Sequence, residues 1–329
     1  MIAWVLALPF CVIAAYSVFA VFKYTRMISN IFMGLVYKPS DVTPGSWGER
    51  VSILDSSDGE ISALHVKCEG SARVLIFCHE SGVDKGSWEK YGYFFPGLGF
   101  HVLSVDFAER NEEAQKNSLS QWPTEAEVEK LVTVVRWVKR AVSPKAQVVL
   151  FGVSKGADLA LAASTRDSAV GAVITDGLFS MKEIFRDYIR RWGPILVKPN
   201  LFGEYYPDWL VNIFSSLGTW HCEKKCGRKF VDVERLLRKK HAPLFMIHGE
   251  FDDYVPTTHQ KRLEYLQRCG APAAVRRPEG AGQEGAAKGR APAYDGRLVV
   301  PNAGHNQAVS LNRESYENEI RIFLERVLK

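Results

Sequence analysis

A serine between two glycines is the first candidate for chemistry in this chain. Ser154 lies in the run Gly152-Val153-Ser154-Lys155-Gly156. Apolar residues before this run predict a buried strand, and small, helix-favouring residues after it predict a helix. A serine at such a turn can act as a nucleophile, because the glycines allow a strained backbone and a close approach of the helix. The alternative is a glycine-rich turn whose serine only caps the helix.

A serine nucleophile needs a base within hydrogen-bond distance and an acid that orients this base. Asp252 follows the apolar run 244–248, and His305 follows the run 298–300. The chain order of serine, acid and histidine, each beyond a strand, predicts a catalytic triad. Taken singly, Asp252 or its neighbour Asp253 could cap a helix, and His305 could be a surface histidine.

These residues are embedded in a regular alternation of strand and helix patterns. From residue 51 a predicted hairpin is followed by the βαβ rhythm of a mostly parallel sheet. Strands are expected at 51–54, 63–67, 74–78, 101–106, 148–153, 172–175, 244–248 and 298–300, and helices at 88–98, 125–142, 155–164, 260–268 and 314–328.

In these motifs the sequence resembles the α/β-hydrolase superfamily. Its members commonly carry the pattern His-Gly-x-x-Asp-x-x-Val-Pro, which residues 248–256 match with His248 and Asp252. The resemblance covers residues 51–329 and implies an α/β-hydrolase fold, a mostly parallel central sheet flanked by helices. It implies that Asp252 is the acid, that His305 of the Gly-His pair is the base and that His248 is structural. The sequence looks nearest to little-characterised bacterial, membrane-anchored members.

The same family binds the reaction's oxyanion with backbone N–H groups. By position, Ser81 in the turn after the strand 74–78 supplies one group, and Lys155 supplies the other. Glu80 stands where the family usually has glycine, and a side chain there would crowd the site or change its charge. His79 is expected to be a structural hydrogen-bonding residue. The Lys155 side chain is expected in solvent, with a contact to an anionic substrate group as the alternative.

Residues 177–242 are predicted to form a helical lid insertion in the domain 51–329. Its aromatic side chains would suit an acyl chain, although packing inside the lid explains many of them equally well. They are Phe179, Phe185, Tyr188, Trp192, Phe202, Tyr205, Tyr206, Trp209 and Phe214. The glycine-, alanine- and proline-rich run 278–296 is predicted to be a flexible surface loop.

Residues 1–22 contain no charged side chain and would span roughly 33 Å as a helix, which predicts a transmembrane anchor. A cleaved signal peptide is the alternative. Lys23, Arg26 and Lys38 follow the span, so a single-pass topology with the hydrolase domain in the cytoplasm is expected. In the juxtamembrane segment 23–50, apolar residues over 28–36 recur at helical spacing and predict a helix on the membrane or on the domain.

Composition argues against nucleic-acid binding and against a metal site. The net charge of +5 is expected to be spread along the chain, without the basic, aromatic-rich run of a nucleic-acid surface. Six scattered cysteines favour a reducing compartment, and the cluster of His221, Cys222 and Cys226 lacks the second group that a zinc site needs. Neither a metal nor another cofactor is expected.

Together these patterns predict a membrane-anchored serine hydrolase that acts on an ester or a related lipid-like acyl substrate through an acyl-enzyme. Because Ser-Lys-Gly is common in the acyl-CoA thioesterase and acyltransferase family, that activity is the first alternative. A peptidase on the same triad is another. A catalytically silent binding module with this fold is the alternative outside the enzymes.

Overall fold

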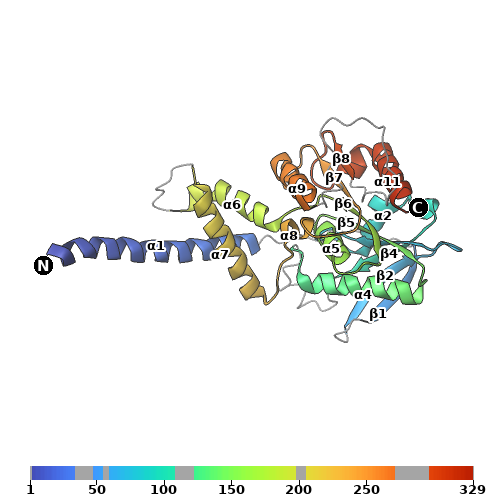
Figure 1. Cartoon of the computed structure of the whole chain (residues 1–329), viewed down its shortest axis with the longest axis horizontal. Coiled ribbons are helices and arrows are strands. Elements are labelled where there is room, and N and C mark those ends of the chain that lie inside the picture. Colours follow the sequence, from blue (N-terminus) through green and yellow to red (C-terminus); the bar gives the residue numbers. More distant parts are fainter. Residues whose placement is uncertain are drawn as a thin grey trace. The chain divides into compact units, whose positions relative to one another are not determined.

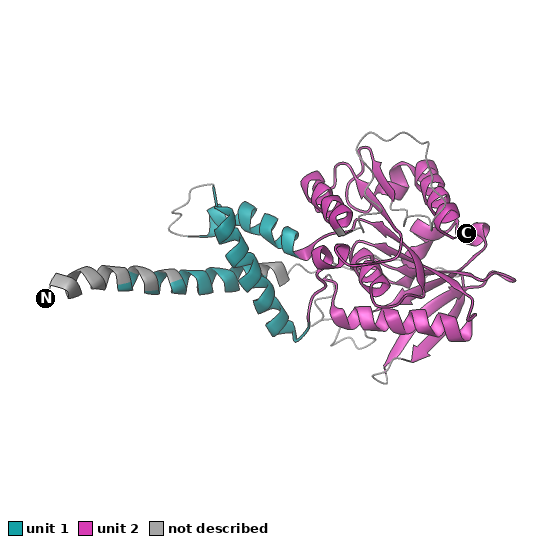
Figure 2. Ribbon diagram, in the orientation of Figure 1, with its two compact units in different colours: residues 1–36, 182–228 teal, residues 37–181, 229–329 magenta. Residues whose placement is uncertain are grey.

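The computed structural model describes residues 2–33, 47–54, 59–107, 122–197, 205–270 and 296–328. The chain divides into two compact units, coloured in Figure 2. Unit 1 contains residues 1–36 and 182–228, and unit 2 contains residues 37–181 and 229–329. Lys38, Phe202 and nearly all of the loop predicted over 278–296 lie outside the described residues.

Unit 2 is built on an eight-stranded sheet with the order β1-β2-β4-β3-β5-β6-β7-β8 (Figure 1). β2 pairs antiparallel with β1 and β4, and the other neighbouring strands are parallel. The predicted hairpin and mostly parallel sheet are therefore confirmed. The strands are β1 (Glu49–Leu54), β2 (Glu60–Val66), β3 (Arg73–Cys78), β4 (Phe100–Asp106), β5 (Gln147–Val153), β6 (Val170–Asp176), β7 (Leu244–Gly249) and β8 (Gly296–Val300).

Helices cover both faces of this sheet. One apolar cluster joins it to α4 (Glu125–Ala141), α5 (Lys155–Ser164), α8 (Val233–Leu237) and α9 (Thr257–Gly270). A second cluster joins the other face to α2 (Trp88–Gly92), α10 (Ala308–Leu311) and α11 (Arg313–Val327). The central strands are buried on both faces, which explains their continuous apolar runs.

The helix predicted over residues 88–98 is confirmed only over residues 88–92 and is wrong as one continuous helix. The chain there forms η1 (Lys85–Ser87), α2 and a separate 3-10 turn, η2 (Pro96–Leu98). Pro96 has no N–H to continue the helix, and Gly99 then adopts a left-handed conformation with φ 77°. Pro96 thus separates the two helical pieces, and Gly99 ends the second one.

Unit 1 is made of α1 (Ile2–Met33), α6 (Met181–Leu196, from residue 182) and α7 (Asp208–Cys226). These helices pack closely at Gly218 of α7, where a Cβ atom would lie 2.2 Å from the Phe185 ring and 3.3 Å from Ser29 Oγ. The hydroxyl of Ser29 donates to the Gly218 carbonyl at 3.4 Å. Most of the predicted lid insertion thus packs with the N-terminal helix.

The N-terminal segment forms one helix through the predicted boundary between anchor and juxtamembrane segment. Tyr24 and Ile28 of α1 are buried. Within the described residues, no helix combines the length and the apolar character needed to cross a membrane. The transmembrane helix predicted over residues 1–22 is thus not among the confirmed features of the fold, and it stays a prediction.

Candidate active site

Ser154 occupies a sharp turn between β5 and α5. Its backbone has φ 50° and ψ −116°, a conformation that non-glycine residues rarely adopt. The N–H of Ser154 donates to the carbonyl of Asp176 at the end of β6, at 2.7 Å. The turn is therefore held by the neighbouring strand as well as by its own glycines.

The two glycines beside Ser154 are required by contacts. A Cβ atom on Gly152 would lie 2.1 Å from the carbonyl oxygen of Gly156. A Cβ atom on Gly156 would lie 2.0 Å from the carbonyl oxygen of Cys78, at the end of β3. These approaches bring the first turn of α5 against the turn that contains Ser81.

The structure brings the three predicted residues together. Nε2 of His305 lies 3.0 Å from Oγ of Ser154, and Nδ1 lies 2.8 Å from Oδ2 of Asp252. A carboxylate can only accept, so Nδ1 carries the proton and Nε2 is left to accept from the serine hydroxyl. This is the arrangement that activates a serine.

Asp252 is positioned by its own loop, after β7. Its Oδ1 accepts from the N–H groups of Tyr254 at 2.9 Å and Val255 at 2.8 Å, and the residue is buried. Asp253 is exposed. The geometry therefore favours Asp252 over its neighbour as the acid.

Contacts also hold the loop after β8. The ring of Tyr254 lies 4.9 Å from that of His305, centroid to centroid. A Cβ atom on Gly177 would lie 3.0 Å from Cε1 of His305. Lys90 donates to the carbonyl of Asn306 at 3.2 Å, and Asn306 has φ 58°. These residues restrict the position of the imidazole.

Glu80 is buried beside the candidate oxyanion turn, and hydrogen bonds hold its side chain. The hydroxyl of Tyr91 donates to Oε1 at 2.9 Å, and that of Ser87 donates to Oε2 at 3.5 Å. Lys90 in turn donates to the Tyr91 hydroxyl at 3.0 Å. Lys90 thus connects the groups around Glu80 with the loop of His305.

Lys155 does not extend into solvent, so that prediction is wrong. Its side chain is buried and forms an ion pair with Glu127 of α4. Glu127 also closes a capping box with Thr124, accepting from its N–H at 3.0 Å. Sequence analysis missed Glu127, although Thr-x-x-Glu before a helix is a recognisable capping signal.

A second buried carboxyl lies next to the triad. Asp176 ends β6, and the Tyr316 hydroxyl of α11 donates to its Oδ2 at 3.0 Å. Burial raises the pKa of Asp176 to about 7, although this hydrogen bond and the charge of His305 lower it. Its position after a predicted strand was the signal that could have identified it.

Two further histidines have structural positions. His248 is completely buried in β7, and burial lowers its pKa to about 3, so its ring is neutral near pH 7. Nδ1 of His79 lies 2.7 Å from the carbonyl oxygen of Glu80, and its Nε2 lies 3.3 Å from Oδ1 of Asp106.

The aromatic residues of the predicted lid have separate environments. Phe179, which belongs to unit 2, is buried between the rings of Trp122 and Tyr254, at 6.1 and 6.0 Å. Others are buried in unit 1, namely Phe185, Tyr206 and Phe214. Trp192, Tyr205 and Trp209 are exposed. Among its described residues in unit 1, the set therefore includes both buried and exposed side chains.

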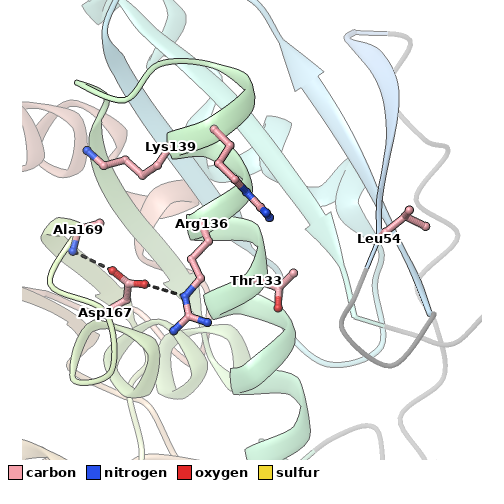
Figure 3. Close-up of a pocket in the computed structure, with 7 residues that line it drawn as sticks. Leu54, Thr133, Arg136, Lys139, Asp167 and Ala169 are labelled. Atoms are coloured by element: carbon pink, nitrogen blue, oxygen red, sulfur yellow. Dashed lines mark hydrogen bonds and ion pairs between the residues drawn. The ribbon is translucent and has the colours of Figure 1, made fainter.

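A groove of about 620 Å³ lies on α4, lined by residues other than the triad (Figure 3). Arg136, Lys139 and Arg140 contribute positive charge to it. Arg136 Nε lies 3.2 Å from Asp167 Oδ2, and Lys139 donates to the carbonyl of Ala146 at 2.9 Å. Protein groups thus already bind two of these cations, and the groove carries no candidate chemistry.

No family model matches the sequence. The uncharacterized protein YqkD of Bacillus subtilis (strain 168) is 22% identical over 279 residues, which are 83% of this chain and 78% of YqkD. The esterase Pf2001 of Pyrococcus furiosus has a similar structure, with TM-score 0.58 and 17% identity, over 89% of this chain and 98% of the esterase. Esterase Est2 of Thermogutta terrifontis gives TM-score 0.57 and 14% identity, over 90% and 96%.

These structural likenesses and the sheet order show that this chain has the α/β-hydrolase fold, as the sequence motifs predict. A special closeness to membrane-anchored bacterial members stays a prediction.

Proposed function

We propose that this protein is a serine hydrolase that cleaves an ester or a related acyl substrate, with Ser154 as nucleophile, His305 as base and Asp252 as acid. The observation that carries the proposal is the position of the His305 ring, 3.0 Å from Ser154 Oγ and 2.8 Å from Asp252 Oδ2. In this arrangement the histidine can accept the proton of the serine hydroxyl while the aspartate orients the histidine, which activates the serine. Two proteins of the same fold, Pf2001 and Est2, are named esterases, which adds support for an ester.

The proposed reaction follows from this geometry. Ser154 Oγ attacks the carbonyl carbon while its proton passes to Nε2 of His305, and the Asp252 carboxylate stabilises the resulting imidazolium. Backbone N–H groups of Ser81 and Lys155 are proposed to receive the negative charge of the carbonyl oxygen. The imidazolium then protonates the leaving group, and a water deprotonated by His305 releases the acyl group. These steps use no cofactor.

Labelling with a fluorophosphonate tests the proposal, because this probe reacts with an activated serine. The wild type should be labelled, and Ser154→Ala should not. Ser168→Ala, which changes an exposed serine, is the matched control and should be labelled like the wild type. A folded wild-type protein that resists labelling would favour the catalytically silent binding module.

Substrate assays separate the alternatives within the enzymes. Hydrolysis of p-nitrophenyl esters, acyl-CoA thioesters and peptide amides should be compared on the same preparation. We expect the ester to be cleaved fastest. A dominant thioester activity would indicate the thioesterase or acyltransferase alternative, and a dominant amide activity would indicate a peptidase.

We also propose that α1 attaches the protein to a membrane, with the hydrolase domain in the cytoplasm. Val12, Val18, Phe19 and Phe22 are exposed on this helix, and residues 1–22 contain no charged side chain. Deletion of residues 1–22 keeps the buried residues Tyr24, Ile28 and Ser29 and should move the protein to the soluble fraction. Protease added to intact cells should leave the full chain uncut, and cleavage would reverse the proposed orientation.

A further inference from the structure

Unit 1 exposes far more apolar side chains than unit 2. Among the described residues, 18 large apolar side chains are exposed, and twelve of them belong to unit 1, which contains about a quarter of the chain. On α6 and α7 and just before α7 they are Trp192, Ile195, Tyr205, Trp209, Ile213, Leu217 and Trp220. Such a concentration is typical of a surface that contacts a partner or a membrane.

Four of these side chains form a continuous row, the α7 stripe, which consists of Trp209, Ile213, Leu217 and Trp220. At 3.6 residues per turn they fall within an arc of about 80° on the helix. The other side of α7 is already used inside unit 1, by Leu210, Val211, Phe214, Ser215, Gly218 and Cys222, which are buried. The stripe is therefore a second, separate apolar face of α7.

The charge of the chain is concentrated in the same unit. Unit 1 holds ten of the 42 Lys and Arg residues but only five of the 37 Asp and Glu residues, so the whole formal net charge of +5 falls on it. The even spread expected from the sequence is wrong. An apolar face on a positively charged unit fits a partner whose surface is negatively charged and whose next layer is apolar hydrocarbon.

Cations lie beside the aromatic residues of this unit. Nζ of Lys224 is 5.1 Å from the ring of Trp220, on the same side of α7 as the stripe. The guanidinium of Arg191 is 5.9 Å from the ring of Trp192 on α6. Tryptophan with neighbouring Lys or Arg is typical of the boundary between lipid tails and headgroups, where the ring is buried and the cation reaches the phosphates.

We propose that the α7 stripe lies in the headgroup region of an anionic lipid bilayer, as a second contact beside α1. The proposal rests on the proposed attachment through α1 and is independent of the chemistry at Ser154. A second copy fits this surface less well, because two units of charge +5 would repel each other. Anionic lipids supply the opposite charge and bury the four apolar side chains.

Hydroxyl-radical footprinting of the full chain tests this surface. The protein is reconstituted into vesicles of phosphatidylcholine with phosphatidylglycerol, and the oxidation rate of each side chain is divided by its rate in denatured protein. Trp209 and Trp220 should be protected at least about tenfold more than Tyr265 and Phe251 of unit 2. These four side chains are 59%, 48%, 65% and 64% exposed in the protein itself, so equal protection would overturn the proposal.

Three further arms identify the partner. Pure phosphatidylcholine vesicles should protect the stripe less, and equal protection there would overturn the assignment to an anionic surface. Protection should persist when vesicles carry one protein each on average, and its loss would indicate a second copy instead.

Ile213→Glu with Leu217→Glu should remove the protection of Trp209, whereas Phe251→Glu should leave it unchanged. In a flotation assay, protein that does not rise with the vesicles would overturn both proposed membrane contacts. Fluorophosphonate labelling of the same samples tests Ser154 separately.

Discussion

Nδ1 of His305 lies 2.8 Å from Oδ2 of Asp252, although the two residues are 53 positions apart. Loss of the carboxylate charge would leave the imidazolium without its stabilising partner and would allow the wrong tautomer. We therefore expect Asp252→Asn to lower kcat/KM for an ester by about 10⁴-fold. Asp253→Asn is the matched control and should change it less than about threefold, because Asp253 is exposed. The opposite order of effects would move the acid by one residue.

The ion pair of Lys155 and Glu127 leads to a prediction about stability. Both side chains are buried, so removal of one partner leaves an uncompensated charge. We expect Glu127→Gln and Lys155→Met each to lower the free energy of unfolding by about 3 to 5 kcal/mol. The double variant should lose clearly less than the sum of the two, because it leaves no unpaired charge. Strict additivity in urea unfolding would show that the pair does not act as a unit.

The strands and the three residues of the candidate triad carry local signals, which is why the sequence could predict them. Gly152 and Gly156 indicate the turn at Ser154. Asp252 and His305 follow apolar runs that form β7 and β8. A parallel sheet brings the ends of such strands to one edge. The sheet therefore places the three residues at one edge, and the loops after β7 and β8 bring Asp252 and His305 to Ser154.

Hydrogen bonds from a side chain on one element to a group far away in the sequence could not be predicted in this way. Tyr316 and Asp176 are 140 positions apart, and Lys90 and Asn306 are 216 positions apart. No local pattern identifies the partner of a buried polar group. For the same reason, apolar periodicity over residues 28–36 predicted a helix on the membrane or on the domain but did not identify α7, with which α1 packs in unit 1.

The close approach at Gly156 predicts a severe effect of one added methyl group. In Gly156→Ala the new Cβ atom would meet the carbonyl oxygen of Cys78 at 2.0 Å, and the backbone on both sides would have to shift. We expect a loss of at least about 3 kcal/mol in the free energy of unfolding, or no folded protein. Gly97→Ala is the control, because nothing lies within 4 Å of its Cβ position. An equally stable Gly156→Ala protein would contradict the geometry of the turn.

The buried carboxyl of Asp176 predicts a particular dependence of stability on pH. Its pKa is raised from 3.8 to about 7 in the folded protein, so between these values the folded state holds a proton that the unfolded state has released. The contribution of Asp176 to the free energy of unfolding therefore falls as pH rises through that range. Asp176→Asn keeps a neutral side chain at every pH. Between pH 5 and pH 8, the wild type should lose about 2 to 3 kcal/mol relative to Asp176→Asn in urea unfolding.

Tyr316→Phe provides the matched comparison for this prediction. The Tyr316 hydroxyl donates to Oδ2 of Asp176 at 3.0 Å and so favours the ionised carboxylate. Without this donor the folded-state pKa of Asp176 should rise further, so the decline in stability, which begins near the unfolded pKa of 3.8, should continue to a higher pH. Because Tyr316 acts on the proton of Asp176, Tyr316→Phe should extend the decline to higher pH only when Asp176 is present, and in the Asp176→Asn background it should leave the pH profile unchanged. A pH profile of the wild type that matches that of Asp176→Asn would show that Asp176 is already ionised in the folded protein near pH 5.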